Sequence, residues 1–175
     1  MYFQQQFGLI FKYLSRFIYW EAIVSTTVCD VAKYILEKQG ACTAMKLQKL
    51  TFYAKAWCLV WDEEELFPEE FEAWANGAVS PVLYAKHRGM FKVSAEMFPD
   101  SNSVNIDPEH KNTINKVLEF YGSYTAQQLS DINHQEPPWN DARGDIPALA
   151  RCSTVISSAA IAEYYSGIWN DEGDE

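Results

Sequence analysis

The chain has 175 residues, of which 48% are apolar and 15% are aromatic, and its formal net charge is −10 at pH 7. This length fits one domain with a real core, and the apolar content excludes general disorder. The acidic balance argues against general binding of DNA or RNA, because neutralising phosphates needs surplus Lys and Arg. A basic or cationic protein partner fits it better.

Three further features of the sequence bear on the class of protein: its cysteines, its histidines and its hydropathy. None of the four cysteines belongs to a Cys-x-x-Cys pair, which predicts free thiols in a reduced, cytoplasmic protein. The three histidines lie far apart and show no metal-ligand spacing, so we expect neither a metal nor a cofactor. No run of eighteen apolar residues occurs, so we expect no membrane span.

Residues 3–20 have the apolar period of an amphipathic helix. The apolar face of this helix includes Phe3, Phe7, Phe11, Leu14, Phe17 and Ile18. Such a helix can dock on the core, bind a partner or lie on a membrane surface. Because its polar face carries only two basic residues, Lys12 and Arg16, we favour docking or partner binding, and we treat residues 1–26 as an accessory element.

Two helices are expected between residues 26 and 61. Thr26 or Thr27 is a suitable N-cap for the first helix, and Gly40 is a suitable end. The second runs from about residue 44 to residue 61, and it is so apolar that we expect it to be the central helix. Its apolar seam consists of Leu47, Leu50, Ala54, Trp57 and Trp61. The acidic run at residues 62–65 lacks the spacing of a Ca²⁺ loop and is predicted to be a solvated turn.

A strand and a short helix are expected next. Residues 71–75 alternate between apolar and polar, which indicates a strand, and Asn76-Gly77 is a turn signal. Ser80 and Pro81 then fit the N-cap and the first position of a helix. The apolar residues of this helix would be Val82, Leu83, Tyr84 and Met90. Its basic cluster at residues 86–88, Lys-His-Arg, is predicted to form an exposed face.

Three more helices complete the predicted chain. Asp107 is expected to cap the first with its side chain, ahead of Pro108, and Gly122 to end it. Thr125 and Gln128 form a capping box for the second, which must stop before residue 137. The third is expected over residues 153–168. Its inward face would consist of Val155, Ile156, Ala159, Ala162 and Tyr165.

These elements predict a mainly α fold. The expected architecture is a compact single-domain helical bundle of about six to seven helices over residues 27–168, with the option of a short β-hairpin near residues 70–79. Residues 169–175 are expected to form an acidic tail.

The segment HQEPPWNDAR, residues 134–143, resembles both an active-site loop and a rigid corner. His134 and Glu136 have the chemistry of an acid–base pair, but no recognisable nucleophile motif accompanies them. In the structural alternative, His134 ends a helix, and the two prolines hold an extended backbone that aims Trp139 into the core or into an anchor position. The residue chemistry favours a structural role over binding, and binding over catalysis.

Three motifs occur in order along the chain. They are LQKLTFYA at residues 47–54 with Ala56-Trp57, EAW at residues 72–74 with NGAVSP at residues 76–81 and Tyr84, and LSDINH at residues 129–134 with Glu136 and Pro138-Trp139. Together they resemble the Panacea antitoxin domain, a family that includes SocA-like and phage-associated GepA proteins. The resemblance covers about residues 28–166. It departs at Ala78 and Pro137, where the family often has Pro and Gly.

The resemblance implies a mostly helical antitoxin, without catalytic activity, that neutralises a cognate protein toxin from an adjacent gene by direct binding. It also implies, for the SocA branch, an adaptor that hands its toxin to the ClpXP protease. By the same analogy, the shared scaffold or partner-binding pocket consists of Trp74, Gly77, Ser80, Pro81, His134, Glu136, Pro138 and Trp139.

Three functions therefore remain, of which we favour the first. The first is an antitoxin, for which Trp139, Trp74 and the phenylalanines of residues 3–20 are candidate anchors. The second is an adaptor or general interaction module, and the third is a hydrolase or transferase that uses His134 and Glu136. The segment before residue 27 is either a toxin-contact element or a leader translated from a misplaced start codon.

Overall fold

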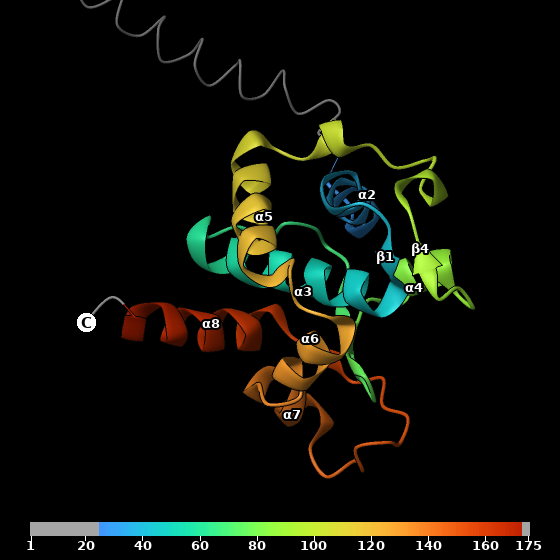
Figure 1. The fold of residues 1–175 in the computed structure, drawn as a ribbon. Helices are drawn as coiled ribbons and strands as arrows, with labels where there is room; N and C mark the ends of the chain where they lie inside the picture. The colour runs from blue at the N-terminus through green and yellow to red at the C-terminus, as the bar shows by residue number, and fades with distance from the viewer. Residues whose placement is uncertain (1–24, 173–175) are drawn as a thin grey trace, which may run out of the picture.

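A computed structural model describes residues 25–172, and this part of the chain is mainly α-helical, as predicted (Figure 1). The helices are α2 (Val28–Gln39), α3 (Ala44–Trp61), α4 (Pro81–His87), α5 (Pro108–Tyr121), α6 (Ala126–Asn133), α7 (Pro137–Arg143) and α8 (Ser158–Glu172). The short elements are β1 (Cys42–Thr43), β2 (Phe71–Trp74), β3 (Gly77–Val79), β4 (Lys92–Val93), β5 (Val155–Ile156) and the 3-10 helices η1 (Ala95–Met97) and η2 (Ser103–Asn105). The helix predicted over residues 3–20, with its proposed toxin-contact face, lies outside the described residues.

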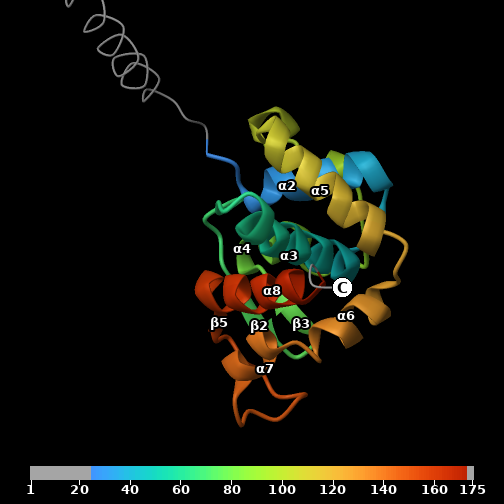
Figure 2. The same ribbon diagram turned by 90° about the vertical axis from the view of Figure 1, so that its left-hand side faces the viewer.

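Helix α3 is the centre of the fold, which confirms the prediction from its apolar seam. Helices α2 and α5 pack against one side of it, and α8, α6 and strand β3 pack against the other (Figures 1 and 2). Burial continues around the whole helix and includes the polar side chains of Gln48, Lys49 and Lys55. Because a buried polar group without a partner is costly, each of these side chains must find a partner inside the protein.

Local capping fixes the starts of two helices as predicted. Thr27 accepts from the Asp30 N–H at 3.2 Å, and the Asp30 carboxylate accepts from the Thr27 N–H at 3.0 Å. This reciprocal pair makes Thr27 the N-cap of α2. Thr125 and Gln128 form the corresponding capping box at the start of α6.

Two other N-caps differ from the prediction. Asp107 and Ser80 both precede a proline that begins a helix, but neither side chain makes a capping hydrogen bond. Proline at the first position has no N–H, so the start of each helix has one fewer free donor. Asp107 is exposed to water, whereas the Ser80 N–H donates to Gln48 Oε1 at 2.9 Å.

Helix α4 is shorter than predicted and less exposed on its basic side. It ends at His87, so Met90 lies beyond it. The prediction of an exposed basic face holds for Lys86 and Arg88 but is wrong for His87, which is buried. The reason is the contact between His87 Nε2 and Gln48 Nε2 at 2.9 Å, which draws the imidazole toward α3.

The last helix begins later than predicted, because the residues before it form a strand, and it also ends later. It runs to Glu172, so residues 169–172 belong to the helix and not to the predicted acidic tail. β5 pairs with β2 in an antiparallel three-stranded sheet of order β3-β2-β5. Pairing with β2 satisfies backbone groups that the first turn of a helix would leave free. Ile156 and Tyr165 are buried as expected, but Val155 and Ala159 are exposed, so the predicted inward face was wrong at these two positions.

Residues 137–143 form helix α7 and not the extended segment that the two prolines suggested. Pro137 and Pro138 occupy its first turn, where a missing N–H leaves no helical hydrogen bond unmade. The helix turns Trp139 into the protein, where its side chain is buried and its Nε1 donates to the Trp74 carbonyl oxygen at 3.0 Å. Of the two alternatives for Trp139, the structure has the core position.

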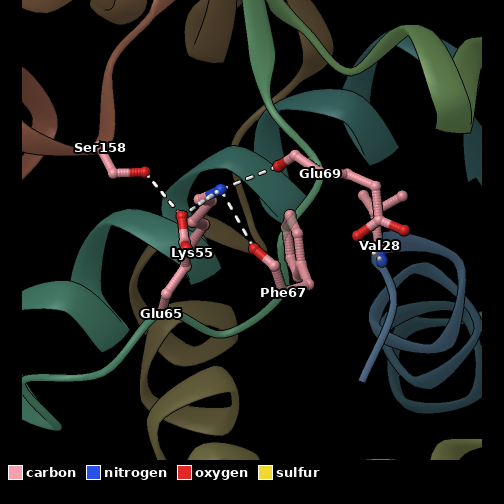
Figure 3. Close-up of polar contacts among 6 residues, drawn as sticks. All are labelled: Val28, Lys55, Glu65, Phe67, Glu69 and Ser158. Atoms are coloured by element: carbon pink, nitrogen blue, oxygen red, sulfur yellow. Dashed lines mark hydrogen bonds and ion pairs between the residues drawn. The ribbon is translucent and has the colours of Figure 1, made fainter. Parts of the chain in front are cut away.

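Lys55 ties the connector that follows α3 to the core (Figure 3). Its Nζ donates to the carbonyl oxygens of Phe67 at 3.1 Å and Glu69 at 2.8 Å, and it lies 3.0 Å from Glu65 Oε1. The same Glu65 oxygen accepts from Ser158 Oγ at 2.7 Å. Burial acts to raise the pKa of Glu65, but these hydrogen bonds outweigh it and lower the pKa. Residues 63–64 of the acidic turn are exposed as predicted, whereas Asp62 is half-buried and accepts from Thr113 Oγ1 at 2.9 Å.

Within residues 25–172, no helix is both long and apolar enough to cross a membrane, and no group of three or more His, Cys, Asp or Glu side chains is placed to hold a metal ion. All four cysteines are free thiols. Burial raises the pKa of Cys29, Cys42 and Cys58, which makes these thiols poor nucleophiles.

Candidate functional site

The predicted site residues meet where the β2-β3 hairpin contacts α4, α6 and α7. Gly77, Ser80, Glu136, Pro138 and Trp139 are buried there, whereas Trp74, Pro81 and His134 are partly exposed. The structure thus brings together residues that are up to 65 positions apart in the chain, as in the hydrogen bond from Trp139 to Trp74.

A chain of hydrogen bonds crosses this junction from one buried charged residue to another. Lys49 Nζ donates to the Ala78 carbonyl oxygen at 2.9 Å. The Ala78 N–H donates to Asn133 Oδ1 at 2.6 Å, and Asn133 Nδ2 donates to Glu136 Oε2 at 2.9 Å. The peptide of Ala78 and the amide of Asn133 therefore connect α3, the hairpin and the start of α7.

Gly77 is the residue that allows Lys49 and Asn133 to approach the hairpin. Its φ is +98°, a conformation that side-chain-bearing residues rarely adopt. A Cβ at this position would lie 2.5 Å from Lys49 Cε and 2.6 Å from Asn133 Oδ1. The turn signal predicted at Asn76-Gly77 is confirmed, and the structure adds a second reason for glycine, which is close packing.

Arg143 and Gln48 hold the two ends of the hairpin. Arg143 Nη1 donates to the Ala73 carbonyl oxygen at 2.7 Å, and its Nη2 contacts the carbonyl oxygens of three residues in the loop after α7, at 2.6, 3.2 and 2.9 Å. Gln48 accepts from the Ser80 N–H and donates to the Ser80 carbonyl oxygen at 3.3 Å. Every one of these contacts uses a buried side chain to satisfy a backbone group.

Sequence reasoning about the site missed Gln48, Lys49, Asn133 and Arg143. A signal for two of them was present. Lys49 and Gln48 stand on a helix that was predicted to be central, and polar residues on a fully buried helix require internal partners. Asn133 stands in the motif LSDINH, but nothing in the sequence indicates its contacts, and no signal marks Arg143. Their partners include backbone groups 55 and 70 residues away.

Burial shifts the pKa values of Lys49 and Glu136, the two ends of the hydrogen-bond chain. It lowers the pKa of Lys49, while the negative charge of Glu136 acts in the opposite direction. It raises the pKa of Glu136 against the effect of the hydrogen bond from Asn133. The hydroxyls of Tyr53 and Tyr165 lie close enough to influence this carboxyl but fall outside hydrogen-bonding geometry, and neither has another partner in the described residues.

His134 and Glu136 do not form an acid–base pair in the part of the chain that the structure describes, because no hydrogen bond joins them. The His134 ring packs against Trp139 with centroids 4.4 Å apart, and burial lowers its pKa. Its backbone N–H donates to Ser130 and ends α6. His134 thus packs against Trp139, whereas Glu136 is bound by Asn133. This geometry does not support joint catalysis by the two side chains.

Beside this junction lies an open groove of about 660 Å³, which we call the aromatic groove. Its walls come from the C-terminal half of α3, from α5 and from α8, and the turn between α6 and α7 closes one end. The aromatic side chains of the walls are Trp57, Trp61, Phe120, Tyr121, Tyr164, Tyr165 and Trp169. Glu136 also lines the groove, so the buried hydrogen-bond chain ends there.

The aromatic groove is a surface suited to binding. Trp57 and Trp61 stack with ring centroids 4.6 Å apart, and Trp169 meets Trp61 edge-on at 5.6 Å. Phe120 and Trp169 remain 64% and 49% exposed. Large aromatic side chains in an open groove bury much apolar area when a partner covers them. Of the eight residues predicted for the scaffold or pocket, only Glu136 lines it. No sequence pattern indicated the groove, because its walls come from separate helices.

Comparison with known families agrees with the sequence motifs. A family model described as the antitoxin SocA-like Panacea domain matches residues 47–140, which is more than half of the chain. No curated protein and no solved structure matches the chain. The matched range contains the whole hydrogen-bond chain from Lys49 to Glu136 and two walls of the aromatic groove, whereas the α8 wall lies outside it.

Proposed function

Because the chain belongs to the SocA-like antitoxin family defined by the Panacea domain, we propose that it neutralises a cognate protein toxin by binding it directly. The observation that carries this proposal is the aromatic groove, an open surface with two large exposed aromatic side chains on a domain of an antitoxin family. The groove supplies the kind of anchor residues on which tight protein–protein complexes depend.

The mechanism that we propose is occlusion. The toxin inserts a segment between α5 and α8, and the bound antitoxin covers the toxin's active site or substrate surface. Phe120 and Trp169 are the outermost aromatic residues of the groove, so they are the first to lose contact with water on binding. Neutralisation then follows from mass action, without any chemical step by the antitoxin.

The hairpin junction has a supporting role in this proposal. Lys49, Asn133 and Glu136 fix the turn between α6 and α7, which closes one end of the groove. A rigid groove loses less conformational entropy on binding than a mobile one, which favours affinity. Contacts that are buried in the free protein thus act on the partner through the shape of the groove.

A growth assay tests the proposal. The adjacent open reading frame is expressed from an inducible promoter, alone and together with this protein. We expect growth arrest by the neighbour alone and rescue by the full chain. Replacement of Trp169 by Ala is expected to weaken rescue, whereas replacement of Phe91 by Ala should not, because Phe91 is 82% exposed and lies outside the groove.

The outcomes separate the proposed function from its alternatives. A neighbour that does not impair growth removes the main support for a dedicated antitoxin. Rescue that disappears in cells lacking a ClpXP-type protease points to an adaptor that delivers the toxin for degradation. Rescue that survives Trp169→Ala and Phe120→Ala together places the toxin contact elsewhere on the chain.

A further inference from the structure

The aromatic groove contains a carboxyl group whose hydrogen-bonding capacity is only partly used. Glu136 lines the groove although its side chain is buried. Among the described residues, its one hydrogen bond comes from Asn133 and reaches Oε2. Oε1 accepts none within hydrogen-bonding geometry, although the hydroxyls of Tyr53 and Tyr165 lie near the carboxyl group and a carboxylate can accept several hydrogen bonds. A buried carboxyl group with a free oxygen facing a groove is a binding group for a donor from outside.

The walls around this carboxyl group favour a cationic donor. Cations are attracted to the faces of aromatic rings, and Trp is the strongest of these partners. The protein already uses one wall in this way, because Lys116 Nζ lies 5.5 Å from the ring centroid of Trp61. Lys116 is itself exposed at the edge of the groove. Within the described chain, no cation lies over the Trp57 ring and none forms a direct ion pair with Glu136. The charge of Lys49 acts on Glu136, but its ammonium group is bound to the Ala78 carbonyl oxygen.

The charge of the protein points in the same direction. The net charge of the chain is −10, and the charged residues that line the groove are Glu119, Glu136 and Lys116. A cationic group that approaches is attracted over long range by the net charge, and inside the groove it meets a surplus of carboxyl groups.

We infer that the aromatic groove receives an arginine side chain of the partner protein. The guanidinium stacks on the tryptophan rings and donates hydrogen bonds to the free oxygen of Glu136. Arginine fits better than lysine, because its planar head both stacks on aromatic rings and binds a carboxylate with two donors, and it is more weakly hydrated. The inference rests on the proposed function, since the partner that presents this arginine is the toxin.

The test uses the full chain and small probes, and it needs no toxin. N-acetyl-arginine amide is titrated at constant ionic strength and at about pH 8, where the Glu136 carboxyl group, whose pKa is about 7, is mostly ionised. Binding is followed by tryptophan fluorescence and by NMR of the probe. The matched control is N-acetyl-citrulline amide, which has the same shape without the charge. We expect saturable binding of the arginine probe with a Kd on the order of 1 mM, and binding of the citrulline probe about tenfold weaker.

Protein variants locate the binding. Glu136→Gln keeps an oxygen that can accept from Asn133, and it should weaken the arginine probe to the level of the citrulline probe. Trp169→Leu, at the exposed end of the groove, should weaken both probes, and Phe91→Ala should change neither. Circular dichroism of each variant shows whether it is folded. If Glu136→Gln unfolds, a loss of binding in folded Trp169→Leu still shows that the probes bind in the groove.

Several results would overturn the inference. Equal binding of the two probes, or an undiminished arginine preference in folded Glu136→Gln, would show that the carboxyl group does not recognise a cation. Binding that appears only when Lys12 and Arg16 are both replaced by Gln would show that the chain's own first segment fills the groove. A dimer that Trp169→Leu dissociates would show that a second copy does.

The probe titration and the growth assay can fail separately. If the protein rescues growth but does not discriminate between the probes, the antitoxin proposal stands and the inference of a bound arginine is wrong. If the protein discriminates between the probes but the neighbouring gene product is harmless, the groove binds cations and its partner is not that neighbour. The arginine then does not come from a toxin encoded there.

Discussion

Lys49 and Glu136 are both buried, yet no direct ion pair joins them in the described part of the chain. The Ala78 peptide and the Asn133 side chain stand between them and bind one each. Each charged group is therefore satisfied by neutral dipoles, which avoids the full desolvation cost of a bare buried charge. This arrangement makes the hairpin turn depend on α3 and α6 at once, and it leads to the first prediction.

Gly77→Ala is expected to destabilise the protein strongly. The new Cβ would overlap Lys49 Cε and Asn133 Oδ1, and the positive φ would also be strained. We expect a loss of about 2–4 kcal/mol in the free energy of unfolding, measured by urea denaturation. Gly89→Ala is the matched control, because Gly89 also has a positive φ of +81° but nothing lies within 4 Å of its Cβ position. An equal loss in both variants would show that packing at Gly77 is unimportant.

Arg143→Lys is expected to loosen the hairpin although it keeps the positive charge. The guanidinium binds carbonyl oxygens with both terminal nitrogens, and a lysine ammonium cannot reproduce this forked geometry. We expect a loss of about 2 kcal/mol and faster hydrogen exchange of the amides in β2 and β3. Arg151→Lys, at an exposed position, should have no effect. Unchanged exchange in β2 would contradict the role assigned to Arg143.

Lys55→Met should detach the connector between α3 and β2. It removes the donor for the carbonyl oxygens of Phe67 and Glu69 and leaves both without this partner. The expected loss is about 2–3 kcal/mol by thermal or urea unfolding, because unsatisfied buried carbonyl groups cost more than the hydrogen bonds themselves contribute. Lys86→Met, at an exposed position of α4, is the control. A variant as stable as the wild type would mean that water replaces the ammonium group.

The stability difference between the wild type and Glu136→Gln should depend on pH. Burial raises the pKa of Glu136 from 4.5 to about 7. The folded protein therefore keeps a proton that the unfolded chain releases above about pH 4.5, so the wild type loses stability as pH rises through this window. Glutamine does not titrate. Between about pH 4.5 and pH 6, we expect the wild type to lose up to about 2 kcal/mol relative to the variant.

This comparison is restricted to acidic pH because burial also lowers the pKa of Lys49 to about 7, and its titration would enter at higher pH. Glu119→Gln, at an exposed position of the groove edge, is the control and should follow the wild type. A stability difference that stays constant over the window would mean that folding does not raise the pKa of Glu136.

Elements defined by neighbouring residues could be predicted from the sequence. The bounds of α3, the end of α2 at Gly40, the capping box of α6 and the turn at Asn76-Gly77 all depend on contacts between residues a few positions apart. Capping and helical periodicity are local effects, so the chain carries them in its order of residues. The family also followed from motifs in the sequence, and the match over residues 47–140 confirms it.

Only the tertiary structure decided which of these residues meet. Strand β5 exists because β2 lies beside it, and α7 places Trp139 inward because the Trp74 carbonyl oxygen accepts its N–H there. The aromatic groove needs walls from α3, α5 and α8, which are far apart in sequence. Such contacts depend on how helices pack and not on local propensity, and a burial pattern read along one helix does not specify the helix opposite. The sequence alone determined the family and the helices that local capping and periodicity define, but not α7 or the bounds of α8. The packing of the helices created the groove and buried Glu136 beside it.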